Sequence, residues 1–363
     1  MHISLTTTEL KSVLETIARV STKHLTLPVL QCVYLEATGD TVAARATNLE
    51  IGIEGTLAAQ VTEAGVVAVP AHVLLQTINL STERTVTLRT EGDVLFVETK
   101  ASHTQIKSIP AEEFPSIPKI TEGGQRINGA LFAVGVKTAA FAASQSSIKP
   151  ELGSVYVVQK KEHTLTFVAT DSFRLMEKTV AQQGVVFPES ILIPYKNALE
   201  LAHIADGDGC DVTLYVNENQ CALTVGNIYI TSRLTNGSFP DYGQIIPKEY
   251  ILHVTTLTSD VAHALKKTNI FLNKFLQVTI SVSNTDVTLS AQSGEVGTTT
   301  ETFTASVEGE PLTLNFNQRY ISEVMGHIVD DSIVMRCAGI GRPMVIENVN
   351  DRSMRYLVMP MNK

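Results

Sequence analysis

The feature that most constrains this chain is an internal repeat with a period of roughly 123 residues. The segment ATNLE at 46–50 is echoed by ATDSF at 169–173 and, more distantly, by AQSGE at 291–295. Each copy directly follows a hairpin pattern, and the hairpin turns keep the same spacing at 38–40, 160–162 and 283–286. Self-similarity at a fixed period indicates successive copies of one structural unit, so three tandem units are predicted.

Helical patterns recur at the same interval. Apolar residues within 10–18 follow the i, i+3, i+4, i+7 spacing of an amphipathic helix, and similar patterns occupy 132–143 and 261–265. A second helix in each unit is expected after Pro70, after Pro194 and at the corresponding place in the third unit, which lacks the proline. Proline suits the first turn of a helix because its missing N–H has no partner there anyway.

Every unit therefore has the order strand, helix, strands, helix, strands. Two helices on one face of an antiparallel sheet form a two-layer α+β domain. A chain of 363 residues also exceeds what one hydrophobic core usually serves. We predict three tandem α+β domains with limits at 1–124, 125–249 and 250–363.

Composition excludes several classes of protein. The N-terminus shows no basic stretch before an apolar run, and the apolar stretches fall short of the ~20 residues of a membrane helix. The four cysteines lie far apart without a C-x-x-C pair, which argues against a zinc ribbon or a disulfide framework. These features predict a cytoplasmic protein without a membrane partner.

No catalytic or cofactor motif is complete. Ser146 and Lys149 fit the S-x-x-K string of penicillin-binding enzymes, but the companion S-D-N and K-T-G strings are missing. The DGDG at 206–209 is out of register for a calcium loop, and GIG at 339–341 lacks the third glycine of a dinucleotide site. The nine histidines show no H-x-x-x-H spacing. We predict no enzyme activity, no cofactor and no metal site.

Positive charge gathers at the first helix of each unit and the loop after it. The windows 6–24, 128–149 and 254–274 are each net positive, although the whole chain has a net charge of −9. Such a basic face suits sequence-independent contact with phosphates. An ordinary solvated helix surface explains the pattern about equally well, so charge alone leaves both interpretations open.

The C-terminal segment YLVMPM at 356–361 is unusually apolar, whereas chain ends normally are polar and fray. It could dock into its own domain or line a binding groove, since methionine fits adaptable partner surfaces. The two interpretations are compatible.

Five segments carry a resemblance to a known family: TLPVL at 26–30, ATNLE at 46–50, ATDSFRL at 169–175, FPDY at 239–242 and VMPM at 358–361. The chain resembles, over essentially its whole length, the bacterial replicative sliding clamps, the β subunits of DNA polymerase III. The resemblance implies a DNA-clamp fold and a homodimeric, head-to-tail ring that encircles duplex DNA. It also implies a non-catalytic processivity factor that tethers the polymerase, the clamp loader and other proteins with a clamp-binding motif.

The resemblance implies two sets of binding residues. The partner-peptide pocket would comprise Leu152, Thr170, Ser172, Phe173, Arg174, Leu175, Pro240, Ile245, Asn317, Tyr320, Met344, Leu357, Met359, Pro360 and Met361. The DNA contacts would comprise Lys23, His24, His72, Gln145, Ser146, Lys149 and Lys196. Phe173 and Gln244 depart from the residues common in the family, which implies a more apolar pocket with a shifted peptide preference.

A ring also needs an interface between its copies. The strands expected at 103–109 and 296–303 carry few charges, and exposed edges of that kind normally find partners. The predicted interface comprises His103, Thr104 and Ile106 from the first unit, with Ile270 and Leu272 from the third.

Two alternatives stay open at this point. An enzyme using Ser146 and Lys149 would react with reagents that acylate serine nucleophiles. A repeat scaffold that binds only proteins would show no retention on circular DNA. Clamps built from three two-domain subunits are disfavoured, because three units are countable in this chain.

Overall fold

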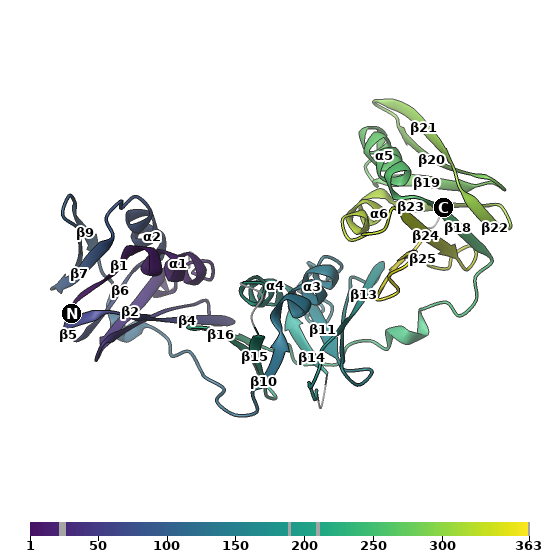
Figure 1. Cartoon of the computed structure of the whole chain (residues 1–363). Coiled ribbons are helices and arrows are strands. Elements are labelled where there is room, and N and C mark those ends of the chain that lie inside the picture. Colours follow the sequence, from purple (N-terminus) through teal and green to yellow (C-terminus); the bar gives the residue numbers. More distant parts are fainter. Residues whose placement is uncertain (22–26, 188–189, 208–210, 362–363) are drawn as a thin grey trace. The chain divides into compact units, whose positions relative to one another are not determined.

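The computed structural model describes residues 1–21, 27–187, 190–207 and 211–361, and these form six α-helices (Figure 1). The helices are α1 (Thr7–Ile17), α2 (Ala71–Asn79), α3 (Gly129–Ala140), α4 (Tyr195–Ala205), α5 (Thr258–Thr268) and α6 (Gln318–Met325). They lie where the repeated patterns predict two helices per sequence repeat. No helix among the described residues is long and apolar enough to span a membrane.

The starts of the second helices show how the sequence sets these elements. Pro70 and Pro194 directly precede α2 and α4, as expected. The third sequence repeat has Asn317 instead, and its side chain accepts a hydrogen bond from the backbone N–H of Arg319 at 3.0 Å. An asparagine cap satisfies one of the unpaired N–H groups of the first turn, so α6 begins without a proline.

The contacts of the chain divide it into two compact units, Met1–Ala133 with Glu200–Leu234, and Val134–Leu199 with Thr235–Lys363. Each unit has two antiparallel sheets. The five-stranded sheet of the first unit has the order β5 (Gln60–Glu63), β1 (His2–Thr6), β7 (Thr85–Glu91), β8 (Val94–Glu98), β9 (His103–Lys107). Its eight-stranded sheet has the order β10 (Gln125–Asn128), β15 (Asp211–Val216), β16 (Gln220–Val225), β17 (Ile228–Arg233), β4 (Ile51–Ala58), β3 (Thr41–Thr47), β2 (Cys32–Thr38), β6 (Gly65–Pro70).

The second unit is built in the same way. Its nine-stranded sheet has the order β14 (Ile191–Pro194), β11 (Ser154–Val158), β12 (Thr164–Thr170), β13 (Arg174–Ala181), β26 (Met354–Val358), β25 (Met344–Asn348), β24 (Ser332–Cys337), β18 (Leu252–Leu257), β22 (Ser306–Gly309). Its four-stranded sheet has the order β21 (Gly297–Thr304), β20 (Asp286–Ser293), β19 (Gln277–Val282), β23 (Leu312–Asn317). Four short 3-10 turns, among them Tyr242–Gln244 (η3) and Asn269–Phe271 (η4), lie in the described connections.

The sheets cross the predicted domain limits. β4 of the first repeat pairs with β17 of the second, with Ile53 opposite Ile230, and β13 of the second repeat pairs with β26 of the third. Strands of two successive repeats therefore share one sheet. Joining sheets edge to edge removes exposed strand edges, and a repeat period in the sequence carries no information about which edges join.

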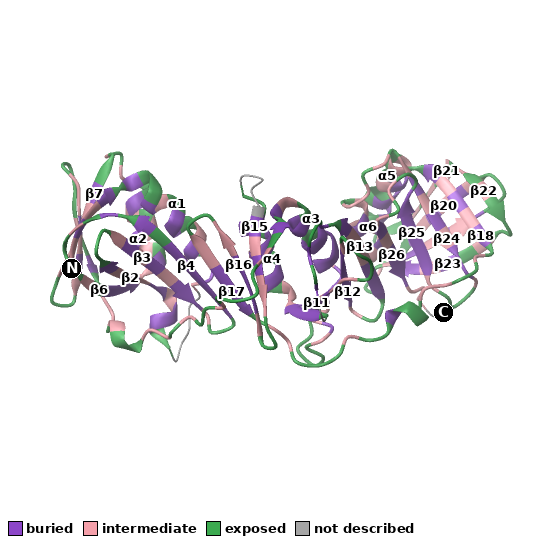
Figure 2. Ribbon diagram, turned by 60° about the horizontal axis from the view of Figure 1, so that its bottom comes forward, coloured by how far each residue is buried: buried purple, intermediate pink, exposed green. Residues whose placement is uncertain are grey.

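The cores form where the periodicities predict them, as the buried strand and helix faces in Figure 2 show. α1 buries Leu10, Val13, Leu14 and Ile17, while β19 alternates half-buried and buried residues along its length. Full burial of one such side chain stabilises the fold by about 1.5–3 kcal/mol. These faces anchor the loops that carry the candidate site.

Candidate functional site

A tight loop between β12 and β13 forms the first wall of the candidate partner groove. The hydroxyl of Thr170 donates to the carbonyl of Arg174 at 2.6 Å and accepts from the N–H of Ser172 at 3.1 Å. Asp171 Oδ1 accepts from the N–H groups of Phe173 and Arg174 at 2.9 and 3.0 Å. Ser172 has a φ of 78°, a region that residues with a side chain seldom adopt. These bonds fix the loop and leave Phe173 62% exposed.

The C-terminal segment forms the second wall. β26 pairs antiparallel with β13, so that Leu357 lies opposite Leu175. Beyond the strand, the N–H of Met359 donates to the carbonyl of Phe173 at 2.8 Å. The N–H of Met361 is also held, by a backbone carbonyl of β23 at 2.7 Å. The loop 170–175 and the apolar C-terminal segment 357–361 are therefore neighbours.

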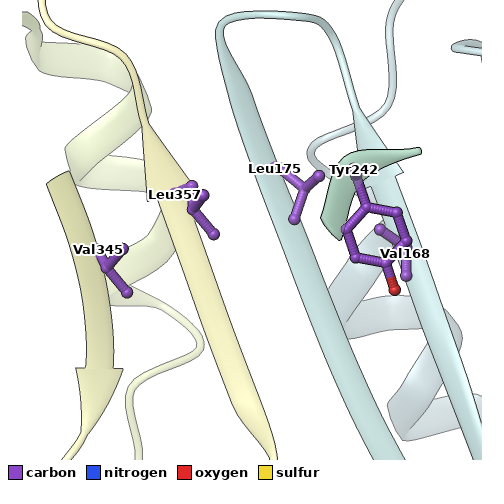
Figure 3. Close-up of a cluster of buried hydrophobic side chains, with 5 residues drawn as sticks. All are labelled: Val168, Leu175, Tyr242, Val345 and Leu357. Carbon is purple, nitrogen blue, oxygen red and sulfur yellow. The ribbon is translucent and has the colours of Figure 1, made fainter. Parts of the chain in front are cut away.

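A buried apolar cluster supports both walls. Figure 3 shows Val168, Leu175 and Tyr242 on one side, with Leu357 and Val345 from neighbouring strands on the other. Tyr242 comes from η3, in the connection that follows the second repeat. Its packing against two strands of the nine-stranded sheet fixes the course of the connection beside the groove.

An ion-paired network holds the same connection. The hydroxyl of Tyr242 donates to Glu177 Oε2 at 2.7 Å, and Lys160 Nζ lies 2.6 Å from the same oxygen. Lys160 also lies 4.6 Å from the centre of the Tyr242 ring. Burial alone would raise the pKa of Glu177, but the hydrogen bonds from Lys160 and Tyr242 lower it below its ordinary value.

The pocket residues named in the sequence analysis fall into three classes of exposure. Leu152, Thr170, Arg174, Leu175, Met344 and Leu357 are buried. Asn317, Tyr320, Met359, Pro360 and Met361 are half-buried. The exposed members are Ser172, Phe173, Pro240 and Ile245. The exposed members with apolar side chains are Phe173, Pro240 and Ile245, and these would be open to an incoming ligand.

Arg174 makes three hydrogen bonds within the chain. Its side chain is 6% exposed, and its guanidinium donates to Asp171 Oδ2 at 3.0 Å, to the carbonyl of Phe141 at 2.8 Å and to the carboxylate of Glu323. The same group lies 4.6 Å from the centre of the Tyr320 ring. Arg174 therefore joins the 170–174 loop to α6, and a contact between Arg174 and a peptide stays a prediction.

Glu323 belongs to this site although the sequence analysis missed it. Burial alone would raise the pKa of Glu323, but hydrogen bonds from Arg174 and Arg319 lower it. Asn317, the other predicted polar contact, uses its side-chain oxygen to cap α6. No local signal reveals the pair of Arg174 with Glu323, because its members lie 149 positions apart.

Five of the residues predicted to contact DNA are described, and all five are exposed. Gln145, Ser146 and Lys149 lie in the loop after α3, His72 in the first turn of α2, and Lys196 in the first turn of α4. The remaining two, Lys23 and His24, lie outside the described residues.

Other cations of the predicted basic windows are partly neutralised. Arg19 Nε and Nη2 donate to the two carboxylate oxygens of Glu200 at 2.7 and 3.1 Å. Lys267 pairs with Glu301 at 2.9 Å. Counting charges along the sequence therefore overstates the free positive charge of the first helices, because the acidic partners come from distant segments.

The comparison with known proteins decides the family. Residues 1–118 match the N-terminal domain of the DNA polymerase III beta subunit, residues 126–241 its central domain and residues 243–362 its C-terminal domain. The chain belongs to this family. Its three-domain α+β clamp fold and its place among the sliding clamps, the non-catalytic processivity factors of DNA polymerase III, are thereby confirmed.

Individual relatives agree over the full length. The chain is 27% identical to a beta sliding clamp of Synechococcus elongatus, over 97% of both chains. It is 28% identical to that of Caulobacter vibrioides, over 99% of this chain and 100% of the relative. The crystal structure of the DNA polymerase III subunit beta from Pseudomonas aeruginosa is 25% identical and superposes with a TM-score of 0.94, covering 100% of both chains.

In this clamp fold, the residues predicted for the subunit interface differ in accessibility. His103 is exposed, Thr104 is half-buried, and Ile106 is 4% exposed because it packs into its own core. Ile270 is 64% exposed in η4, and Leu272 beside it is half-buried. Ile106 therefore cannot supply a side-chain contact to a second copy, and β9 would have to act through its backbone edge.

Proposed function

We propose that two copies of this chain form a head-to-tail ring that encircles duplex DNA. The observation that carries the proposal is the pair of terminal strands β9 and β21, each of which ends its sheet with one hydrogen-bonded neighbour. Pairing β9 of one copy with β21 of the other would remove both open edges. Exposed Ile270 and half-buried Leu272 lie directly after α5 and would extend this contact with apolar surface. Under this proposal the domain limits remain 1–124, 125–249 and 250–363.

The same proposal gives the exposed polar side chains their role. Lys149 and Lys196, with His72, Gln145 and Ser146, would contact phosphates without reading bases. The chain has a net charge of −9, so the ring would hold DNA by closure rather than by strong attraction. This function places the protein in the cytoplasm, on the chromosome.

The groove beside Phe173 would bind the polymerase, the clamp loader and other proteins that carry a short clamp-binding motif. The exposed apolar side chains of Phe173, Pro240 and Ile245 support this assignment, because small interfaces concentrate their energy in a few apolar anchors. Leu357 and Val358 are buried strand residues. The tail whose removal tests the groove therefore begins at Met359.

The ring is tested by mass and by topology. A dimer has a mass of about 79 kDa, twice the 39.4 kDa of one chain, and light scattering would measure it. A loaded ring should stay on nicked circular DNA at high salt and should leave once the DNA is linearised. A monomeric mass, or equal retention on both forms of DNA, would contradict the proposal and favour a scaffold that binds only proteins.

A further inference from the structure

The loop that forms the first wall of the proposed groove occurs a second time, between β3 and β4 in the first compact unit. Between β3 and β4, the hydroxyl of Thr47 donates to the carbonyl of Ile51 at 2.8 Å and accepts from the N–H of Leu49 at 3.0 Å. Asn48 Oδ1 accepts from the N–H groups two and three positions further on, at 3.0 and 2.9 Å. Leu49 has a φ of 76°, against 78° at Ser172. Both repeats therefore build the same loop.

The neighbouring strand is attached in the same way. The N–H of Arg233, at the end of β17, donates to the carbonyl of Glu50 at 2.8 Å, as that of Met359 donates to the carbonyl of Phe173 at 2.8 Å. The first unit thus repeats the backbone of both walls of the groove. The side chains differ, because Arg233 and Glu50 stand where the groove has Met359 and Phe173.

A cavity of about 80 Å³ lies between this loop and the connection 115–118. Leu49, Ile51 and Ile117 supply apolar lining, and Gly52 lets Ile117 lie directly on the strand, since a Cβ at this position would lie 2.8 Å from Ile117 Cγ2. A cavity of this volume suits a small aliphatic side chain such as that of valine.

Arg233 supplies a positive charge at the mouth of the cavity. Arg233 is exposed and lines the cavity, and within the described parts of the chain its guanidinium has no ion-pair partner. Glu50 also lines the cavity and is engaged in contacts of its own. A carboxylate next to a small aliphatic side chain would complement this combination of apolar lining and unpaired cation.

We propose that this cavity is a second peptide-docking site, of different specificity, which takes a short segment with a valine-sized side chain next to a carboxylate. The assignment rests on the proposed function of the groove beside Phe173, whose backbone it repeats. The carboxylate comes from an acidic side chain or from the end of a chain. One clamp would then hold two classes of partner peptide at different positions.

Methyl NMR of the full chain, labelled at isoleucine, tests the site. Ile51 and Ile117 report on the first-unit cavity, and Ile245 reports on the groove. The probes are acetyl-Gly-Val-Asp-Gly-amide, its asparagine analogue, and acetyl-Gly-Val with a free carboxylate. We expect the aspartate peptide, the free-carboxylate peptide or both to shift the methyl signals of Ile51 and Ile117, while the signal of Ile245 stays in place. The asparagine analogue should bind about fivefold more weakly than the aspartate peptide.

Matched variants separate the cavity from general effects of charge. Arg233→Glu should weaken the aspartate probe by about fivefold or more, whereas Arg342→Glu, at an exposed turn, should leave its affinity unchanged. If the Ile51 and Ile117 signals do not shift at saturating probe, or if Arg233→Glu binds the aspartate probe as tightly as the wild type, the second site would be overturned. A glutamine-leucine-x-leucine-phenylalanine peptide should shift Ile245 alone, and its failure to do so would count against the groove instead.

Discussion

Replacing Arg174 by methionine tests whether this residue holds the groove together rather than contacting its ligand. Methionine keeps much of the apolar bulk but removes the three hydrogen bonds to Asp171, Glu323 and the carbonyl of Phe141. The loop that carries Phe173 would lose its attachment to α6. Both the stability of the second unit and the peptide affinity of the groove should fall.

The expected magnitude follows from burial. Removing one partner of a buried ion pair costs about 3–5 kcal/mol, because the other charge is left without compensation. Here the Arg174 side chain is 6% exposed but that of Glu323 is 29% exposed, so water can solvate the remaining carboxylate in part. We expect a loss of about 2–3 kcal/mol in the free energy of unfolding. Arg319 still donates to Glu323 at 2.6 Å in this variant. Glu323→Gln should therefore cost less stability in the Arg174→Met background than in the wild type, because the interaction with Arg174 is already gone.

Urea denaturation of the full chain at pH 7 and at lower pH measures the effect. The pKa of Glu323 is lowered in the fold. The stabilisation from the pair is therefore complete above the ordinary carboxyl pKa near 4.5 and is lost as the pH falls through the lower folded value. The difference between wild type and Arg174→Met should shrink in that range. The exposed control Arg352→Met should change stability by less than about 0.5 kcal/mol.

The pair would not stabilise the fold if Arg174→Met lost no more stability than the control Arg352→Met. The same would follow if the stability effects of Arg174→Met and Glu323→Gln were strictly additive. Unchanged affinity for a clamp-binding peptide, despite the lost stability, would show that the loop keeps its shape without Arg174.

Three further predictions address the ring and its ligands. Ending the chain after Val358 should cost at least ~2 kcal/mol of peptide affinity by calorimetry while the dimer persists, and equal affinity would place the groove elsewhere. Changing Lys149 and Lys196 together to alanine should lower the log-log salt slope of DNA binding by nearly one unit for each lost contact, whereas an unchanged slope would remove both from the DNA surface. Charged residues in place of both Ile270 and Leu272 should give folded monomers in light scattering, and a dimer at low micromolar concentration would count against this interface.

The sequence predicts the fold well where periodicity carries the information. The apolar face of α1 and the strand alternation of β19 lie where they were expected, because burial acts on each residue in a regular element. The attachment of β13 to β26 was only partly predictable. An apolar chain end at 356–361 indicates docking, but not which strand receives it.

The polar parts of the site were less predictable because their partners are remote in sequence. The sequence places Arg174 in the predicted pocket, but it does not reveal the hydrogen bonds that this side chain makes to groups from 141, 171 and 323. Arg19 was counted as free positive charge, yet Glu200 binds it from 181 positions away. Ile106 was placed at an interface, although the pleat of β9 turns it into its own core.

The position of β26 also has a consequence for synthesis. β26 comes last in the strand order of the sequence, but it is not an edge strand: it lies between β13 and β25 in the nine-stranded sheet. A nascent chain that has not yet released residues 354–358 therefore has two open strand edges facing a gap, and such edges invite pairing with other chains. Because the same strand carries the tail onto the groove, an interrupted chain would combine a tendency to aggregate with an incomplete groove.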